Sequence, residues 1–163
     1  MASGATLVTF HPFQNEPPSS NYAVVGVRNL HPYLAFDTTT GWSAVFTGIL
    51  PRAYAGGGLT VYLHTMMASA TTGTVGYTVS IERMDDSSLD LDADSFASAQ
   101  TVTAATVPGT SGQTLLQSAA FTSGAQMDSL AAGEQFRIKI TRDVANDTAA
   151  GDAQLVMAEV KET

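Results

Sequence analysis

The stretch TVGYTVSIE, residues 74–82, decides the fold class, because apolar and small polar side chains alternate along it. Successive side chains of a β-strand point to opposite faces, so every second residue of this stretch would lie against a core. An amphipathic helix would instead repeat its apolar residues every three or four positions. The pattern therefore predicts a half-buried strand whose inner face carries Val75, Tyr77, Val79 and Ile81.

Runs of the same kind continue on both sides of this stretch. Residues 59–68 alternate as well, and a short turn containing Gly73 joins them to the strand at 75–82, which is typical of an antiparallel hairpin. Residues 136–160 repeat this organisation and predict a second long hairpin. Further short runs lie at residues 42–50, 100–107 and 114–122. The prediction is an all-β protein, an antiparallel β-sandwich of jelly-roll type with about eight strands.

The first 32 residues differ from the rest because prolines interrupt them at positions 12, 17, 18 and 32. Proline disfavours both helix and central strand, so we expect an extended N-terminal arm over residues 1–32, followed by a sandwich domain at 33–163. Within the arm, residues 7–10 and 23–27 could pair as edge strands. The arm is too apolar for a free tail and is expected to dock on its own domain or on a neighbouring subunit. The candidate partner-binding residues are Phe10, Phe13, Tyr22, Val24 and Leu30.

Composition argues against several classes of function. The net charge is −8, and the charges of residues 1–80 sum to zero, so the whole negative excess lies in the second half of the chain. The negative electrostatic field of these charges repels the phosphate groups of nucleic acids, and no cluster of lysine or arginine offsets it. Nucleic-acid binding is therefore not expected. No apolar run approaches the roughly 20 residues that a membrane helix needs, and the N-terminus lacks the features of a signal peptide. The absence of cysteine rules out disulfides and thiolate metal sites.

The segment at residues 85–94 holds five carboxylates, which would repel one another unless solvent or a hard cation neutralised them. Asp90, Asp92 and Asp94 have the spacing that begins an EF-hand calcium loop. Ser95, however, stands where that loop needs glycine, and residue 101 is threonine where it needs glutamate. A solvated acidic loop is therefore the prediction, and a calcium site of another kind is the alternative. No cofactor is expected.

No catalytic motif is visible in the sequence. The three histidines, His11, His31 and His64, lack the spacing of a metal site, and no serine lies in a G-x-S-x-G motif. We therefore expect a protein that is not an enzyme. Trp42 follows a glycine at the start of an expected strand and is the best candidate for an exposed aromatic residue in a carbohydrate site.

Short strings spread over residues 33–163 carry a resemblance to a known group of proteins. They are FTGILP at 46–51, YAGGGLTV at 54–61, ERM at 82–84, DSFA at 94–97 and GEQFRIKITRD at 133–143, with NDT at 146–148 and GDA at 151–153. In these short strings the chain resembles jelly-roll virion structural proteins of tailed bacteriophages, of the head-decoration or tail-fibre type. That pattern carries no catalytic residues to transfer.

The resemblance implies a non-enzymatic capsid decoration, or cement, protein on the virion surface, assembled in the host cytoplasm. Its partner would be the major capsid protein, whose neighbouring subunits it would clamp through the N-terminal arm and through self-association as a homo-oligomer, expected to be a trimer. Only 13% of the residues are charged, which suits a surface partly buried against further copies. The alternative is a tail-fibre or receptor-binding module of jelly-roll type that recognises carbohydrate through Trp42.

Overall fold

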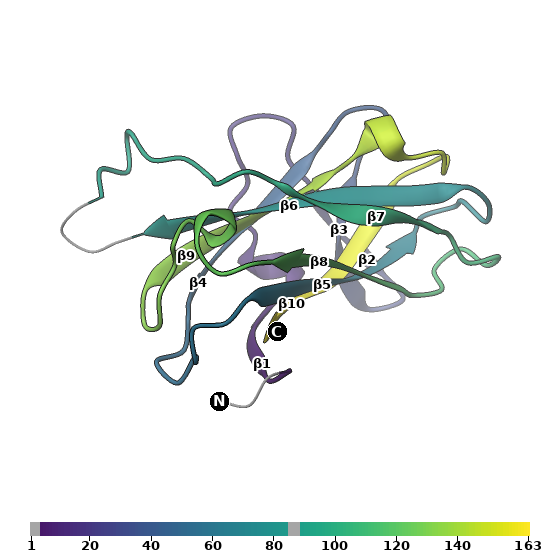
Figure 1. Cartoon of the computed structure of the whole chain (residues 1–163). Coiled ribbons are helices and arrows are strands. Elements are labelled where there is room, and N and C mark those ends of the chain that lie inside the picture. The colour runs from purple at the N-terminus through teal and green to yellow at the C-terminus, as the bar shows by residue number, and fades with distance from the viewer. Residues whose placement is uncertain (1–3, 85–88) are drawn as a thin grey trace.

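Two antiparallel sheets lie face to face in the computed structural model, which describes residues 4–84 and 89–163 (Figure 1). The larger sheet has the order β2-β3-β10-β5-β8, and β1 pairs with β10 beside this path; the smaller sheet has the order β4-β9-β6-β7. The strands are β1 (Thr6–Phe10), β2 (Val24–Arg28), β3 (His31–Phe36), β4 (Ser43–Ile49), β5 (Leu59–Met67), β6 (Thr74–Met84), β7 (Gln100–Thr106), β8 (Leu115–Phe121), β9 (Gln135–Arg142) and β10 (Ala153–Glu162). Three 3₁₀ turns are η1 (Pro12–Gln14), η2 (Ala125–Met127) and η3 (Val144–Asn146).

This architecture confirms the predicted all-β sandwich, with ten strands among the described residues rather than about eight. The stretch at 74–82 lies in β6, between β9 and β7 in the interior of the smaller sheet. Its predicted inner face is correct, since the four apolar residues there are at most 1% exposed and belong to one core shared by both sheets. No helix within residues 4–84 and 89–163 is long and apolar enough to cross a membrane.

The two predicted hairpins are wrong. β5 lies in the larger sheet and β6 in the smaller one, and β10 and β9 are divided in the same way. The connections at 68–73 and 143–152 therefore cross from one sheet to the other. A loop of this length can span the roughly 10 Å between packed sheets as readily as it can close a hairpin. Within its own sheet β5 pairs with β8 and β10, and β6 pairs with β7 and β9.

The N-terminal segment contributes two strands to the larger sheet, and residues 16–23 between these strands bond to β4 of the smaller sheet. β1 pairs antiparallel with β10, and β2 pairs with β3 to form the edge of the sheet. The boundary expected between residues 32 and 33 therefore falls inside β3. Phe10, expected on a partner-binding surface, is only 1% exposed and stacks on Phe46 with ring centroids 5.3 Å apart. Its ring fills the core and is not available to a partner.

Arg142, at the end of β9, is a fully buried side chain that closes one end of the sandwich. Its Nε donates to Asp147 Oδ2 at 2.7 Å, and its Nη1 donates to the carbonyl oxygens of Phe36 at 3.1 Å and Gly151 at 2.9 Å. Its Nη2 donates to the carbonyl oxygen of Ala149 at 3.2 Å. The guanidinium group thus joins the loop between β9 and β10 to the end of β3 and donates to three backbone carbonyl groups.

Replacing Arg142 by methionine should lower the free energy of unfolding by about 3–5 kcal/mol, because it removes the charged partner of the buried Asp147 carboxylate and the side-chain donors to three backbone carbonyl groups. Urea unfolding followed by circular dichroism measures this loss. The exposed Arg52→Met is the matched control and should change stability by no more than about 0.5 kcal/mol. Equal stability of the two variants would show that the buried guanidinium does not hold this end of the fold together.

Candidate functional site

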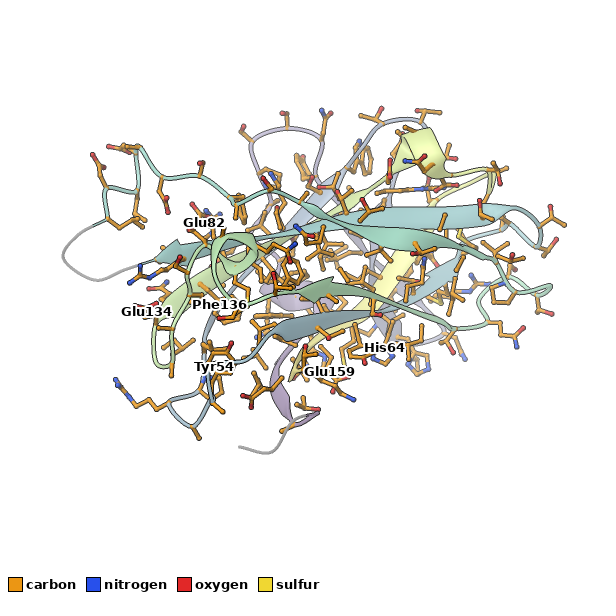
Figure 2. All side chains as sticks on the ribbon, in the orientation of Figure 1. Tyr54, His64, Glu82, Glu134, Phe136 and Glu159 are labelled. Carbon is orange, nitrogen blue, oxygen red and sulfur yellow. The ribbon has the colours of Figure 1, made fainter. Side chains whose placement is uncertain are left out.

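Three hollows on the described surface are large enough to be weighed as binding sites. One, of about 340 Å³, lies beside Tyr54 beyond the end of β4 (Figure 2), and small alanine, glycine and serine residues form most of its wall. The hydroxyl group of Tyr54 already donates to the carbonyl oxygen of Gly57. A second, of about 410 Å³, lies beside Arg28. The third, of about 240 Å³, is lined by Tyr22 and Trp42, and its chemistry makes it the candidate functional site.

The backbone brings Tyr22 and Trp42 together although they are 20 positions apart in the sequence. Tyr22 forms an isolated parallel β-bridge with Ser43. The amide of Ser43 donates to the carbonyl oxygen of Asn21 at 2.8 Å, and the amide of Ala23 donates to the carbonyl oxygen of Ser43 at 2.9 Å. These backbone hydrogen bonds therefore fix Tyr22 beside Trp42 at the start of β4.

The lining of this hollow, which we call the aromatic pocket, consists of Asn21, Tyr22, Val24 and Trp42. Tyr22 is 45% exposed, and Trp42 is half-buried, with part of its ring packed against the core. An aromatic face covers the apolar face of a small molecule, and an amide side chain both donates and accepts hydrogen bonds. No lining residue is charged. The pocket therefore offers stacking surfaces and an amide to a neutral polar ligand.

Asp37 orders the loop that carries Trp42. Its Oδ1 accepts hydrogen bonds from the amides of Thr39 at 2.8 Å and Thr40 at 2.6 Å, and from the hydroxyl group of Thr39 at 2.8 Å. These bonds, the Thr39 amide first, lower the pKa of the Asp37 carboxyl group below its usual value of 3.8. The amide of Trp42 donates in turn to the carbonyl oxygen of Thr40 at 2.7 Å, so the turn and the tryptophan are directly connected.

The outer face of the larger sheet carries a polar cluster around Glu159 (Figure 2). The Nε2 of His64 lies 3.9 Å from Glu159 Oε2, and the Nζ of Lys161 lies 3.8 Å from Glu159 Oε1. The hydroxyl group of Thr6 donates to the same carboxylate, and Lys161 also lies 5.0 Å from the ring centroid of Tyr62. These interactions join β1, β10 and β5, and we interpret the cluster as a surface network that stabilises the sheet.

The structure places the residues singled out in the sequence in several separate regions. Tyr22 and Val24, selected as partner-binding residues, line the aromatic pocket together with Trp42, selected as a carbohydrate residue. Phe13 is 71% exposed and Leu30 is 91% exposed, and neither lines this pocket. Asn21 was missed, because a single asparagine before a tyrosine carries no recognisable signal.

The acidic segment shows no grouping that would hold a metal ion among the residues with described positions. Asp90 instead organises its own loop, since its Oδ1 accepts from the amide of Asp92 at 3.1 Å and its carbonyl oxygen accepts from the amide of Asp94 at 3.0 Å. The first part of the segment, residues 85–88, lies outside the described residues.

No protein-family model and no curated protein matches the sequence, but solved structures share its fold. One is the C-terminal CBM6 of a marine laminarinase from Zobellia galactanivorans, with a TM-score of 0.56, 9% identity and coverage of 95% of this chain and 98% of that chain. Another is a family 35 carbohydrate-binding module from an environmental isolate, with a TM-score of 0.57, 12% identity and coverage of 96% and 94%. A third is a CBM6 from Cellvibrio mixtus lichenase 5A in complex with cellotriose, with a TM-score of 0.53, 11% identity and coverage of 98% and 99%.

These likenesses extend over nearly the whole chain and show a jelly-roll sandwich of the kind found in carbohydrate-binding modules. At identities of 9 to 12% they show the fold alone. None of the three shows a relation to a virion protein.

Replacing Asp37 by alanine should free the loop at 37–42 and raise the exposure of Trp42 to a soluble quencher. Trp42 is the only tryptophan in the chain, so acrylamide quenching of its fluorescence reports on this loop alone. The pKa of Asp37 is lower in the folded protein than its usual value of 3.8. The stability that the ionised carboxylate gives to the loop is therefore complete above pH 3.8 and is lost as the pH falls through the pKa of the folded state. Quenching of the native protein should therefore rise only in that acidic range. In Asp37→Asn, which keeps an acceptor oxygen but cannot ionise, this acid-induced rise should disappear.

Proposed function

We propose that this protein is a non-catalytic carbohydrate-binding domain that holds one neutral sugar residue in the aromatic pocket. The observation that carries the proposal is the convergence of an exposed tyrosine, a half-buried tryptophan and an asparagine in one surface hollow. The jelly-roll fold supports it, because one solved structure of similar fold is described as a complex with cellotriose.

The two rings of the aromatic pocket stay partly in contact with water, unlike the aromatic side chains of the core. Other aromatic side chains, such as Phe36, Phe46, Tyr77 and Phe136, are completely buried and fill the core. An aromatic side chain that stays in water lacks about 1.5–3 kcal/mol of the stabilising free energy that burial would give. A ligand that covers the ring recovers part of this free energy. The pocket therefore has a driving force for binding that the core positions lack.

The size of the pocket indicates how much of a saccharide it would hold. Its volume of about 240 Å³ lies below the roughly 300–1,000 Å³ of pockets that enclose drug-sized ligands. One sugar residue, either free or at the end of a chain, matches this size better than an extended oligosaccharide. Two stacking contacts and a few hydrogen bonds correspond to a dissociation constant of about 1 mM.

Titration with neutral saccharides should change the fluorescence of Trp42, because the bound ring would displace water from the indole. Cellotriose, xylotriose and galactose are suitable probes. Tyr22→Ala keeps the tryptophan reporter and should weaken binding about two- to tenfold, as expected for one lost stacking contact. Trp42→Ala should weaken it about tenfold or more in calorimetry.

Tyr62→Ala is the matched control, because Tyr62 is a partly exposed tyrosine on the outer face of the larger sheet. It should bind as the unaltered protein does. Native affinity in both Tyr22→Ala and Trp42→Ala, or no response to any neutral saccharide at millimolar concentration, would refute the proposed site.

A second candidate function follows from the resemblance to tailed-phage virion proteins: a capsid decoration protein that self-associates as a homo-oligomer. One feature of the structure favours self-association. β2 is the edge strand of the larger sheet, and Val25 and Val27 on it are 44% and 61% exposed. Edge strands of stable monomers are commonly protected by lysine, proline or a bulge, and β2 contains none of these three. A second copy of the chain could pair its own β2 with this edge.

The turn that follows β2 supports the same idea. Asn29 and Leu30 both have positive φ, at 46° and 65°, and Leu30 is 91% exposed. A left-handed leucine costs about 1–2 kcal/mol, and full exposure gives no packing within the chain to offset this cost. A contact with a second copy would provide that compensation.

Leu30→Gly should raise the free energy of unfolding of the monomer by up to about 1 kcal/mol, because glycine tolerates a positive φ. The same change should weaken self-association, measured by analytical ultracentrifugation. Leu91→Ser removes another exposed apolar side chain, in the connection between β6 and β7 of the smaller sheet, and is the control that should leave association unchanged. A native protein that stays monomeric at the highest soluble concentration would eliminate this candidate.

A further inference from the structure

The hollow of about 410 Å³ lies between two elements that cover one end of the larger sheet: the hairpin formed by β2 and β3, and the loop that joins β7 to β8. Its volume falls within the range of pockets that enclose small molecules. We call it the Arg28 pocket. Residues from both elements and from β5 and β10 line it: Arg28, His31, Met66, Ser111, Thr114 and Val156.

Arg28 is held in this pocket by neutral groups. Its Nη1 lies within hydrogen-bond distance of the carbonyl oxygens of Met67 at 3.1 Å and Ala68 at 3.3 Å, and of Gln154 Oε1 at 3.4 Å. Among residues 4–84 and 89–163 no carboxylate forms an ion pair with it. By contrast, Arg142 pairs with Asp147. Arg28 is therefore a half-buried cation that no carboxylate of the described residues neutralises.

The side of the guanidinium group opposite these contacts remains open. Its Nη2 has only a long contact of 3.4 Å with Ser111 Oγ, and its Nε has no acceptor among the described residues. Nε and Nη2 together form the fork that binds a carboxylate through two parallel hydrogen bonds. Arg83 uses this same fork, donating from Nε and Nη2 to Glu134 at 2.7 and 2.6 Å (Glu134 is labelled in Figure 2).

The loop between β7 and β8 is shaped to fit the guanidinium group. Gly112 has a φ of +81°, and a Cβ atom there would lie 2.7 Å from both Cζ and Nη2 of Arg28 and 3.1 Å from its Nε. Because the Cβ position is no nearer to the two nitrogen atoms than to Cζ, the backbone of Gly112 lies over the face of the group rather than against its Nε and Nη2 edge. The amide of Gly112 also donates to the carbonyl oxygen of Met67 at 3.0 Å. The cation is thus fixed before any ligand arrives, which lowers the entropic cost of binding.

We propose that the Arg28 pocket binds the carboxylate group of a uronic acid through the Nε and Nη2 fork of Arg28. The hydroxyl groups of Ser111 and Thr114 and the imidazole of His31 are polar neighbours for sugar hydroxyl groups, and Met66 and Val156 are apolar neighbours for the ring. This site is separate from the aromatic pocket, whose lining is uncharged, and it extends the ligand class from neutral to acidic saccharides.

The test is a titration of the whole protein with glucuronate, followed by the side-chain Nε–H resonance of arginine in ¹⁵N NMR spectra. Glucuronate should shift the Arg28 resonance, and glucose, which lacks the carboxylate, should not. Acetate distinguishes the two sources of a carboxylate: binding much weaker than that of glucuronate supports a sugar acid, and equal binding overturns it. An equal response to sulfate would likewise show general attraction of anions and overturn carboxylate recognition.

Variants of Arg28 distinguish the contribution of the two-pronged hydrogen-bonding geometry to binding from the contribution of the positive charge. Arg28→Lys keeps the positive charge but loses the fork and should weaken glucuronate binding about tenfold, and Arg28→Gln should weaken it further. Binding to these variants is measured by calorimetry, and native circular dichroism shows that they are folded. Arg52→Gln removes an exposed arginine and should bind as the unaltered protein does.

The outcome for Trp42→Ala keeps this proposal distinct from the function proposed above. That variant should retain the Arg28 shift with glucuronate even where it has lost neutral saccharides. Native glucuronate affinity in Arg28→Gln, or an Arg28 resonance that does not move, would overturn the assignment of the Arg28 pocket while leaving the aromatic pocket untouched.

Discussion

The buried guanidinium group of Arg142 is the interaction on which this end of the sandwich depends. Two connections here, 37–42 and 143–152, cross between the sheets, and the Arg142 side chain bonds carbonyl groups of the second connection and of the end of β3. A buried carbonyl without a donor costs about 1–3 kcal/mol, and Arg142 supplies donors to three of them. The amide of the same residue donates to the carbonyl oxygen of Trp42 at 3.1 Å. The residue that closes the core therefore also fixes the backbone beneath the proposed sugar site.

The strands were predictable because each of them buries one face. The burial of one face appears in the sequence as an apolar residue at every second position. β6 and β9 show it most clearly, with Phe136, Ile138 and Ile140 buried at every second position of β9. Which strands pair was not predictable from turn length. The loop at 68–73 is about as short as a hairpin loop, and the strands that it joins place their apolar faces on one core whether they lie in the same sheet or in opposite sheets, so the alternation does not distinguish the two arrangements.

In the candidate site, too, the sequence indicates the individual residues but does not indicate which of them come together in the fold. Trp42 and Tyr22 were each recognisable as aromatic residues at the margin of a strand, and they were assigned to different functions. Their convergence depends on the bridge between Tyr22 and Ser43, which joins segments with no shared local pattern. A sequence reports the type of side chain at a position, but only the fold reports its neighbours. Asn21 illustrates the limit, since its place in the pocket follows entirely from that bridge.

The N-terminal segment links the two proposed binding sites. Its unusual composition, rich in proline and in apolar side chains, predicts an arm that docks on its own domain or on a neighbouring subunit. In the structure Pro32 begins the divergence of the outer hairpin from β10, since β3 pairs with β10 only from residue 34 onward. The hairpin can then bring Arg28 to the carbonyl oxygens of Met67 and Ala68 at the end of β5. Residues that looked suited to leave the domain are thus the residues that shape hollows on its surface.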